Sequence, residues 1–279
     1  MGLRGANGMK KISTMLLCLL IGLAAIVSGC GDSKPAQSAQ GGESPEIKAI
    51  KDRGVLKVGV KVDVPKFGFK DPQTNKIDGL EIDIARAIAK KILGDPNKVE
   101  LQGVTAKARG PLLDNGEIDL AIASFTITEE RKKSYNFSEP YFTDHIGLMV
   151  KKNSGLKSLK DMDGKKIGVA QSATAHKDLQ AEADKLGVKV QFLEFASHPE
   201  IKTAFDSGRI DVYGGDISIL SGYLDDTNTI LDDRYSPQRN GVGIKKSNTA
   251  LTKVVNETVE EMQKNGELEK LIQKLDIKR

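Results

Sequence analysis

The sequence lacks tryptophan, and its two cysteines, Cys18 and Cys30, both lie within the first 30 of its 279 residues. No block of five like charges occurs. Because residues 1–29 hold three basic and no acidic residues, the chain beyond them carries 39 Lys+Arg against 38 Asp+Glu, a net charge of about +1. A nucleic-acid-binding surface therefore has no electrostatic support. Without a second cysteine beyond residue 29, stability must come from a hydrophobic core.

The sequence also lacks the motifs of common catalytic sites. Its histidines, His145, His176 and His198, are scattered without the spacing of metal ligands, and no cysteine follows Cys30 to bind zinc. It contains no Gly-x-Ser-x-Gly motif, phosphate-binding loop or dinucleotide fingerprint. These absences disfavour an enzyme and indicate neither a metal nor another cofactor.

The first 29 residues have the pattern of a secretory signal. Basic residues at 4, 10 and 11 precede an apolar run at 15–27, which is too short to span a membrane. The run ends in Val-Ser-Gly-Cys at 27–30, which resembles the bacterial lipobox and predicts lipidation of Cys30. A plain signal with an incidental cysteine is the alternative. We expect a lipid-anchored protein on the extracytoplasmic side of the cell membrane.

The rest of the chain divides into a tether and two lobes. Residues 30–46 are rich in Gly, Ser, Gln and Pro and predict a flexible tether. Beyond it, apolar strands alternate with amphipathic helices, among them one at 80–93 and a closing one from Thr249 to the C-terminus. This alternation indicates an α/β fold of two doubly wound lobes. We expect two hinge crossovers between them, near 141–145 and 236–240. Lobe 1 would then be discontinuous, at 47–142 and 240–279, and lobe 2 would span 143–239.

A repeated hexad supports the two-lobe organisation. Asp-Asn-Gly-Glu-Ile-Asp at 114–119 recurs as Asp-Ser-Gly-Arg-Ile-Asp at 206–211, and each copy runs into an apolar strand, at 120–123 and 211–214. Gly ends a helix, a turn follows and a strand begins. Because ligands of open α/β sheets bind beyond the carboxyl ends of the strands, the residues after these two strands should face a cleft.

The segment at 124–131, Ser-Phe-Thr-Ile-Thr-Glu-Glu-Arg, follows the first of these strands. Thr128 is placed to cap a helix that opens at Glu129, and Arg131 projects from its first turn. Exposed amides at a helix start together with a guanidinium suit a carboxylate ligand. An ion pair between Arg131 and a surface acid is the alternative.

This segment, with Tyr-Asn-Phe-Ser-Glu-Pro-Tyr at 135–141, resembles the signature of family 3 bacterial solute-binding proteins, the polar-amino-acid receptors of ABC importers. Gly-Leu-Glu-Ile-Asp at 79–83 and Gly-Val-Ala-Gln-Ser at 168–172 also match, and the resemblance extends from about 47 to 279. It implies a type II periplasmic-binding-protein fold, a monomer, and delivery of an amino acid to a membrane permease by closure of two lobes.

The resemblance also implies roles for single residues. Arg131 would bind the ligand α-carboxylate, with hydrogen bonds from Ser124 and Thr126, and Asp216 would bind the α-ammonium. The turn Ser172-Ala173-Thr174 would contribute amides and a hydroxyl from lobe 2. For Asp216, helix capping is the alternative.

Segments at 58–65 and 105–116 resemble the branch that binds aspartate and glutamate, in which the residues matching Lys61 and Arg109 meet the side-chain carboxylate. Two extra cations suit a dianionic ligand. Surface ion pairs are the alternative for both. His198 stands where that branch has a tyrosine near the ligand, and could donate to a carboxylate, although a lone histidine is more often a surface residue. Gln171 leaves open a neutral ligand such as glutamine, and cysteine is a further candidate.

Two other functions remain open at this point. Some dehydratases that act on prephenate-like acids share the fold, and would need a general acid, for which Glu194, Asp216 or His198 could serve. The receptor could also act as a surface adhesin or as the input of a sensor. We expect a binding protein for aspartate or glutamate without enzymatic activity.

Overall fold

The computed structural model describes residues 44–277. The predicted signal, the lipidation site Cys30 and most of the predicted tether lie outside this range. Helix α1, Pro45–Arg53, begins one residue before the tether was expected to end, because Ser44 is an extended N-cap residue and Pro45 suits the first turn. Residues 45 and 46, which the sequence assigned to the tether, therefore belong to the first helix.

The first large sheet has the strand order β5–β1–β6–β14–β7. Strands β1 (Leu56–Val60), β5 (Val99–Gly103) and β6 (Leu120–Ile122) are parallel to one another. Strand β14 (Gly243–Lys245) pairs antiparallel with both β6 and β7 (Tyr135–Phe137). A strand from the last sixth of the chain therefore lies inside a sheet whose other members come from its first half.

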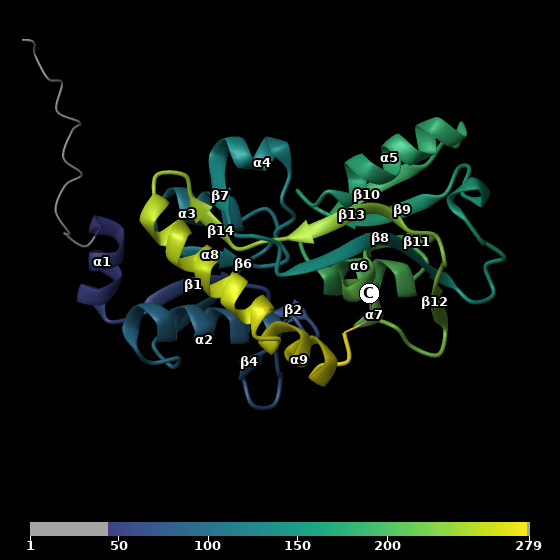
Figure 1. Ribbon diagram of the computed structural model, residues 1–279. Helices are drawn as coiled ribbons and strands as arrows, with labels where there is room; N and C mark the ends of the chain where they lie inside the picture. The colour runs from purple at the N-terminus through teal and green to yellow at the C-terminus, as the bar shows by residue number, and fades with distance from the viewer. Residues whose placement is uncertain (1–43, 278–279) are drawn as a thin grey trace, which may run out of the picture. The chain divides into compact units, whose positions relative to one another are not determined.

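Helices from both ends of the chain cover this sheet. Helix α2 (Leu80–Leu93), predicted at 80–93, packs against α8 (Thr249–Lys264), and Figure 1 shows α8 beside α2. One closing helix from Thr249 to the C-terminus was expected, but the helix stops at Lys264 and α9 begins at Glu267. Gly266, at φ +74°, separates the two, since glycine disfavours a helix interior.

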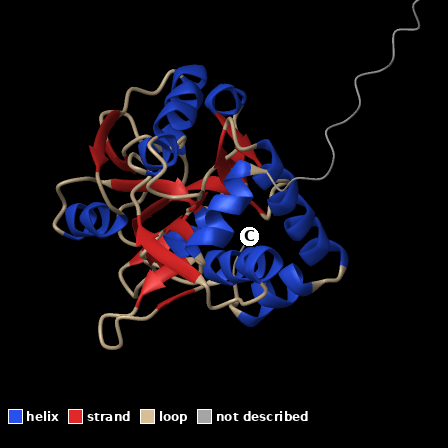
Figure 2. Cartoon of the chain, turned by 90° about the vertical axis from the view of Figure 1, so that its left-hand side faces the viewer, coloured by secondary structure: helices blue, strands red, loops and turns tan. Residues whose placement is uncertain are grey.

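The second large sheet is built from residues 142–240. Its order is β10–β9–β11–β8–β12, and β13 also pairs with β8. The parallel strands β9 (Lys166–Ala170), β10 (Gln191–Phe195) and β11 (Val212–Asp216) alternate with helices α5 (Ala175–Leu186) and α6 (His198–Asp206). Helix α7 (Ile217–Ser221) and the 3₁₀ turn η1 (Leu159–Asp161) complete this lobe. In Figure 2, which views the chain from the side of the first lobe, helices flank the strands.

The long strand β8 (Phe142–Lys151) and its partners β12 (Asn228–Ile230) and β13 (Tyr235–Asn240) were not predicted. Nor was the small antiparallel sheet of β2 (Asp63–Val64), β3 (Gly68–Lys70) and β4 (Ile77–Asp78). β8 is buried on both faces over much of its length, so its sequence does not alternate.

The two chain crossings between the sheets lie side by side. One crossing lies just before β8, which begins at Phe142, and the other lies just after β13, which ends at Asn240. Phe142 and Asn240 are opposite each other in the antiparallel pair of β8 and β13. The Tyr141 N–H donates to the Asn240 carbonyl at 2.9 Å. Two α/β lobes joined by two crossovers, as the sequence predicts, are therefore confirmed.

The repeated hexad performs the same structural task in each lobe. Gly116 and Gly208, at φ +76° and +74°, end the helices α3 (Arg109–Asp114) and α6. The last hexad residue then accepts a backbone N–H of the adjacent parallel strand: Asp119 Oδ2 from Lys57 at 2.8 Å, and Asp211 Oδ2 from Lys166 at 2.9 Å. The repeat thus fixes where β6 and β11 start, and with them where their carboxyl ends point.

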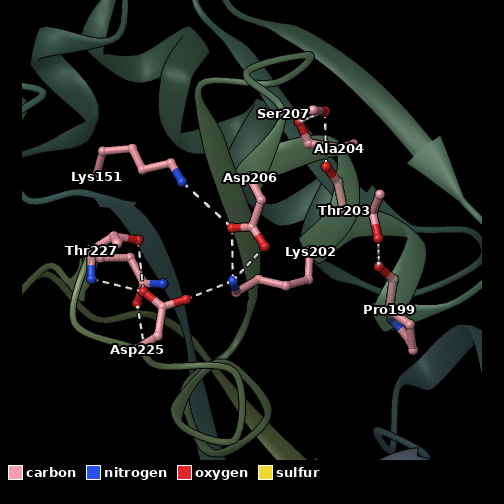
Figure 3. A network of polar contacts seen from close by, with 10 residues as sticks. Lys151, Pro199, Lys202, Thr203, Ala204, Asp206, Ser207, Asp225 and Thr227 are labelled. Carbon is pink, nitrogen blue, oxygen red and sulfur yellow. Dashed lines mark hydrogen bonds and ion pairs between the residues drawn. The ribbon is translucent and has the colours of Figure 1, made fainter.

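An ion network stabilises the outer part of the second lobe (Figure 3). Lys202 on α6 lies 2.7 Å from Asp206 and 2.7 Å from Asp225, and Thr227 donates to Asp225 from its N–H and hydroxyl. The hydrogen bond from Lys202 is the main cause that holds the pKa of Asp225 below its usual range. None of these residues lines the pocket described next.

Candidate ligand-binding site

A pocket lies where the strand ends of the two lobes face each other. Strand β6 leads into residues 123–126, β9 into 170–175, and β11 ends at Asp216. Eight of the ten predicted ligand-binding residues line this pocket: Lys61, Arg109, Ser124, Thr126, Ala173, Thr174, His198 and Asp216. The other two, Arg131 and Ser172, line an adjoining cavity that shares Thr126, Ala173 and Thr174 with it. The structure therefore brings the predicted residues together.

Arg131 connects the two lobes directly. Thr128 caps helix α4 (Glu129–Ser134) as predicted, and its hydroxyl accepts the Arg131 N–H at 3.1 Å. The guanidinium then donates from Nη1 to the Thr126 carbonyl at 2.7 Å and from Nη2 to the Ser172 carbonyl at 2.9 Å. Because these two carbonyls belong to opposite lobes, Arg131 stands at the point where they meet.

Arg109 is buried rather than at the surface, with 3% of its area exposed. Its Nη1 donates to the Ala123 carbonyl at 2.5 Å and to the Ser124 carbonyl at 3.1 Å, and its guanidinium lies 4.1 Å from the centre of the Phe125 ring. Burial, and next the charge of Arg131, lower its pKa to about 9. Arg109 therefore supports the loop at 123–126 through Nη1, while its buried Nε has no hydrogen-bond partner among residues 44–277.

Lys61 is also buried, and its charge is balanced by an acid that sequence analysis missed. Its Nζ lies 3.0 Å from Asp63 Oδ1, and the exposed fractions of the two side chains are 4% and 15%. Burial raises the pKa of Asp63, but the charge of Lys61 and other neighbours outweigh it and leave the pKa below its usual range. The surface ion pair that was the alternative for Lys61 is therefore wrong, since this pair is enclosed.

His198 is a buried residue of the pocket, 6% exposed, and not a surface histidine. Its Nδ1 lies 2.7 Å from the Tyr213 hydroxyl, and its backbone N–H donates to Asp63 Oδ2 at 3.3 Å. Burial, and next the charge of Lys61, lower its pKa to about 3. The imidazole is therefore neutral at physiological pH and can either donate or accept a hydrogen bond.

A second contact between the lobes forms beside His198. Tyr223 donates its hydroxyl to the Asp63 carbonyl. Gly222 packs so closely on Pro65 that a Cβ added there would lie 3.0 Å from the proline ring. Together with the contact of Arg131 with Ser172, this gives two separate points at which the lobes touch on either side of the pocket.

The loops that face each other share a Ser-x-Thr sequence, at 124–126 and 172–174. Ser124 and Ser172 both have left-handed backbone conformations, with φ of +47° and +60°. Thr174 donates to Gln238 Oε1 at 2.6 Å. A non-glycine residue with positive φ is uncommon and points to a functional constraint.

Asp216 ends β11 and precedes α7. Burial, and next the charge of the nearby Asp144, raise its pKa to about 8, while Arg109 and Arg131 oppose the rise. Its side chain forms no capping hydrogen bond to α7. Asp216 therefore occupies the N-cap position of α7, as the alternative had it, but its side chain does not cap the helix, and the residue lines the pocket.

Sequence analysis did not assign a site role to Glu81, Asp63, Asp144 or Gln238. Glu81 belongs to the Gly-Leu-Glu-Ile-Asp segment, and the signal that could have found it is an acid on the buried face of an amphipathic helix. Phe67 and Phe69 do not line the pocket: Phe67 is in the core and Phe69 is 39% exposed. Glu194 pairs with His176 at 2.8 Å, away from the pocket.

Within residues 44–277, no three or more His, Cys, Asp or Glu side chains are grouped as a metal would require. Over the same residues, no helix combines the length and apolar character needed to cross a membrane.

Comparison with known proteins matches residues 56–275 to the bacterial extracellular solute-binding proteins, family 3. The glutamine-binding protein of Geobacillus stearothermophilus is 40% identical over 243 residues, 84% of this chain and 91% of that protein. The ABC transporter glutamine-binding protein GlnH of Bacillus subtilis (strain 168) is 36% identical over 271 residues, 95% of this chain and 97% of that protein. The structure of an ancestral arginine-binding protein bound to glutamine is 38% identical with a TM-score of 0.72, and the match covers 80% of this chain and 98% of that one.

Proposed function

Because the chain belongs to family 3 of the bacterial extracellular solute-binding proteins, we propose that it captures glutamine and delivers it to the permease of an ABC importer. The protein acts outside the cytoplasm, as its family does, and it is a binding protein for an amino acid. Two relatives that match most of its length are glutamine-binding proteins, which supports glutamine over the aspartate or glutamate expected from the sequence.

The observation that carries the choice of ligand is the enclosed pair of Lys61 and Asp63. Lys61 would favour an acidic ligand only if its charge were free, and Asp63 already balances it at 3.0 Å. The carboxylate of an acidic side chain would then meet a lysine that is already paired. Burial of an unpaired charge is unfavourable, whereas a neutral amide needs only hydrogen bonds.

The buried histidine that lines the pocket supports the same ligand. The neutral His198 can donate to an amide carbonyl or accept from an amide N–H, so it suits either end of the glutamine side chain.

The family roles fit this arrangement. Arg131 would hold the α-carboxylate, with Ser124 and Thr126 beside it, and Asp216 would hold the α-ammonium from the other lobe. Because a ligand favours closure only if it contacts both lobes, these charge pairs would drive the closing motion. Cys30 would anchor the protein to the membrane by a lipid, and the predicted domain limits stay as proposed above.

Calorimetry on residues 31–279, freed of bound ligand, tests the proposal with glutamine, glutamate, aspartate, cystine and arginine. We expect glutamine to bind at least tenfold more tightly than the other four. The matched control is Asp63→Asn, which leaves the charge of Lys61 uncompensated and should raise the ratio of glutamate to glutamine affinity.

Tight binding of glutamate or aspartate by the unaltered chain would overturn the choice of ligand, because it would show that Lys61 is free to act on a carboxylate. Binding of none of the five would overturn the amino-acid receptor itself, and turnover of a prephenate-like acid would then identify a dehydratase.

A further inference from the structure

Glu81 is a fully buried acid that points at the ligand-binding loop from the helix below it. It lies in the first turn of α2, with none of its surface exposed. Its Oε1 accepts three hydrogen bonds: from the Ser124 N–H at 2.6 Å, from the Ser124 hydroxyl at 3.0 Å and from the Tyr141 hydroxyl at 2.7 Å. Two of the three donors thus belong to one residue of the pocket.

Only one of the two carboxyl oxygens of Glu81 is hydrogen-bonded within the part of the chain that the structure describes. Oε2 is buried and has no hydrogen-bond partner among residues 44–277. Burial raises the pKa of Glu81, against the hydrogen bonds from Tyr141 and Ser124 and the charge of Lys61. A buried acid with one unsatisfied oxygen is unfavourable for folding, so a function is the more natural reason for it.

Ser124 is the residue on which these contacts act. Its φ of +47° lies in the left-handed region that serine rarely adopts. Glu81 binds its N–H and its hydroxyl, and on the other side Arg109 donates to its carbonyl at 3.1 Å. Ser124 is therefore held from two sides. The buried carboxylate of Glu81 accepts from its N–H and hydroxyl, and the buried guanidinium of Arg109 donates to its carbonyl.

We infer that Glu81 is a positioning residue for ligand capture: it holds Ser124 in the left-handed conformation and so presents the loop at 123–126 to the ligand. Glu81 does not line the pocket and acts through Ser124. Arg109 supports the same residue from the carbonyl side. The inference rests on the proposed function, since it names what makes the proposed site competent to bind.

Glycine adopts positive φ without strain, so it offers a direct test. If loss of Glu81 leaves the loop competent in about a tenth of the molecules, the apparent affinity falls about tenfold. We expect Glu81→Ala to weaken glutamine binding by about this factor when residue 124 is serine. In a Ser124→Gly background, where residue 124 adopts positive φ without support from Glu81, Glu81→Ala should change affinity by less than about threefold.

Tyr141→Phe is the matched control, because it removes the third hydrogen bond to Glu81 but leaves Ser124 held. It should weaken binding less than Glu81→Ala does. Urea unfolding of each variant shows whether it is folded. Equal losses on Glu81→Ala in the serine and glycine backgrounds would overturn the inference, because they would assign Glu81 a general role in packing.

A measurement without ligand separates this inference from the proposed function. The carbon chemical shifts of Ser124 depend on its backbone conformation and can be followed by NMR in the ligand-free protein. In Glu81→Ala they should move away from left-handed values, while those of Ser172 stay unchanged. Unchanged Ser124 shifts would overturn the inference even if glutamine binds, and failure of the unaltered chain to bind glutamine would overturn only the proposed function.

Discussion

Glutamine binding should release a proton from Asp216, and its affinity should therefore rise with pH. In the ligand-free site, burial and the charge of Asp144 raise the pKa of Asp216 to about 8, although Arg109 and Arg131 oppose them. The carboxyl is then mostly protonated at pH 7. An ammonium group bound beside it favours the ionised form. The ligand-free protein thus binds more protons than the complex, and higher pH favours the complex.

The size of the effect follows from the fraction of sites that are ionised. With a pKa of about 8, roughly one site in a hundred is ionised at pH 6, about one in eleven at pH 7 and about half at pH 8. Since affinity scales with the competent fraction, it should rise about fiftyfold between pH 6 and pH 8, and most steeply at the lower end.

The raised pKa of Asp216 also affects the stability of the ligand-free protein, which should fall as pH rises. The pKa of Asp216 is raised above its value in the unfolded chain, so its contribution to stability is fully present below the unfolded pKa and is lost as pH rises through about 8. Glutamine should offset this loss, so its stabilising effect on thermal unfolding should grow from pH 6 to pH 8.

Calorimetry at pH 6, 7 and 8, in pairs of buffers with different ionisation enthalpies, measures both the affinity and the protons released. About 0.9 protons per glutamine are expected at pH 7. In Asp216→Asn, whose side chain cannot ionise, the remaining affinity should not vary over this range. Asp144→Asn should lower the pKa of Asp216 and shift the rise to lower pH. An affinity that is constant from pH 6 to pH 8, with no proton release, would refute the role of Asp216.

The remaining predictions concern residues other than Asp216 and Asp144. Arg131→Ala should weaken every amino-acid ligand by roughly 30-fold or more in calorimetry, because loss of one partner of a buried charge pair costs about 2–5 kcal/mol; unchanged affinity would remove Arg131 from the site. Gly222→Val should hold the lobes apart against Pro65 and weaken glutamine binding, with a larger radius by small-angle scattering as the check. Lys202→Met should lower the free energy of unfolding in urea by about 1 kcal/mol without changing affinity, since its ion pairs are partly exposed. Cys30→Ala should abolish incorporation of labelled palmitate and release the protein from membranes.

Much of the fold could be predicted because local patterns coincide with it. Helix α2 was predicted to the residue, since its apolar positions follow helical spacing and Gly79 precedes it. The relation to amino-acid-binding structures of the same fold is confirmed. Strands β8 and β13 were missed because they pair with each other across some 90 residues, and such pairing leaves little trace in either sequence alone.

The site was predicted in outline but not in its electrostatics. The motif at 124–131 and the ends of two strands identified which residues face the pocket. That Lys61 is paired with Asp63, two residues later and across a turn, depends on the small sheet that was not predicted. Likewise Glu81 reaches Ser124 only because α2 packs beneath the end of β6, a contact between residues 43 positions apart. The sequence shows how many charged residues the site region has, but it does not show which of them pair with one another.

The position of β14 between β6 and β7 has a consequence for how the protein matures. Every strand of the second sheet lies within residues 142–240, so that sheet needs no strand from either end of the chain. The first sheet cannot be completed until residues 243–245 are available, and its helix α2 lacks the partner α8 until the end of the chain. Such distant pairings form slowly. The first lobe, and with it the binding site, should therefore form only after the chain has been synthesised as far as α8.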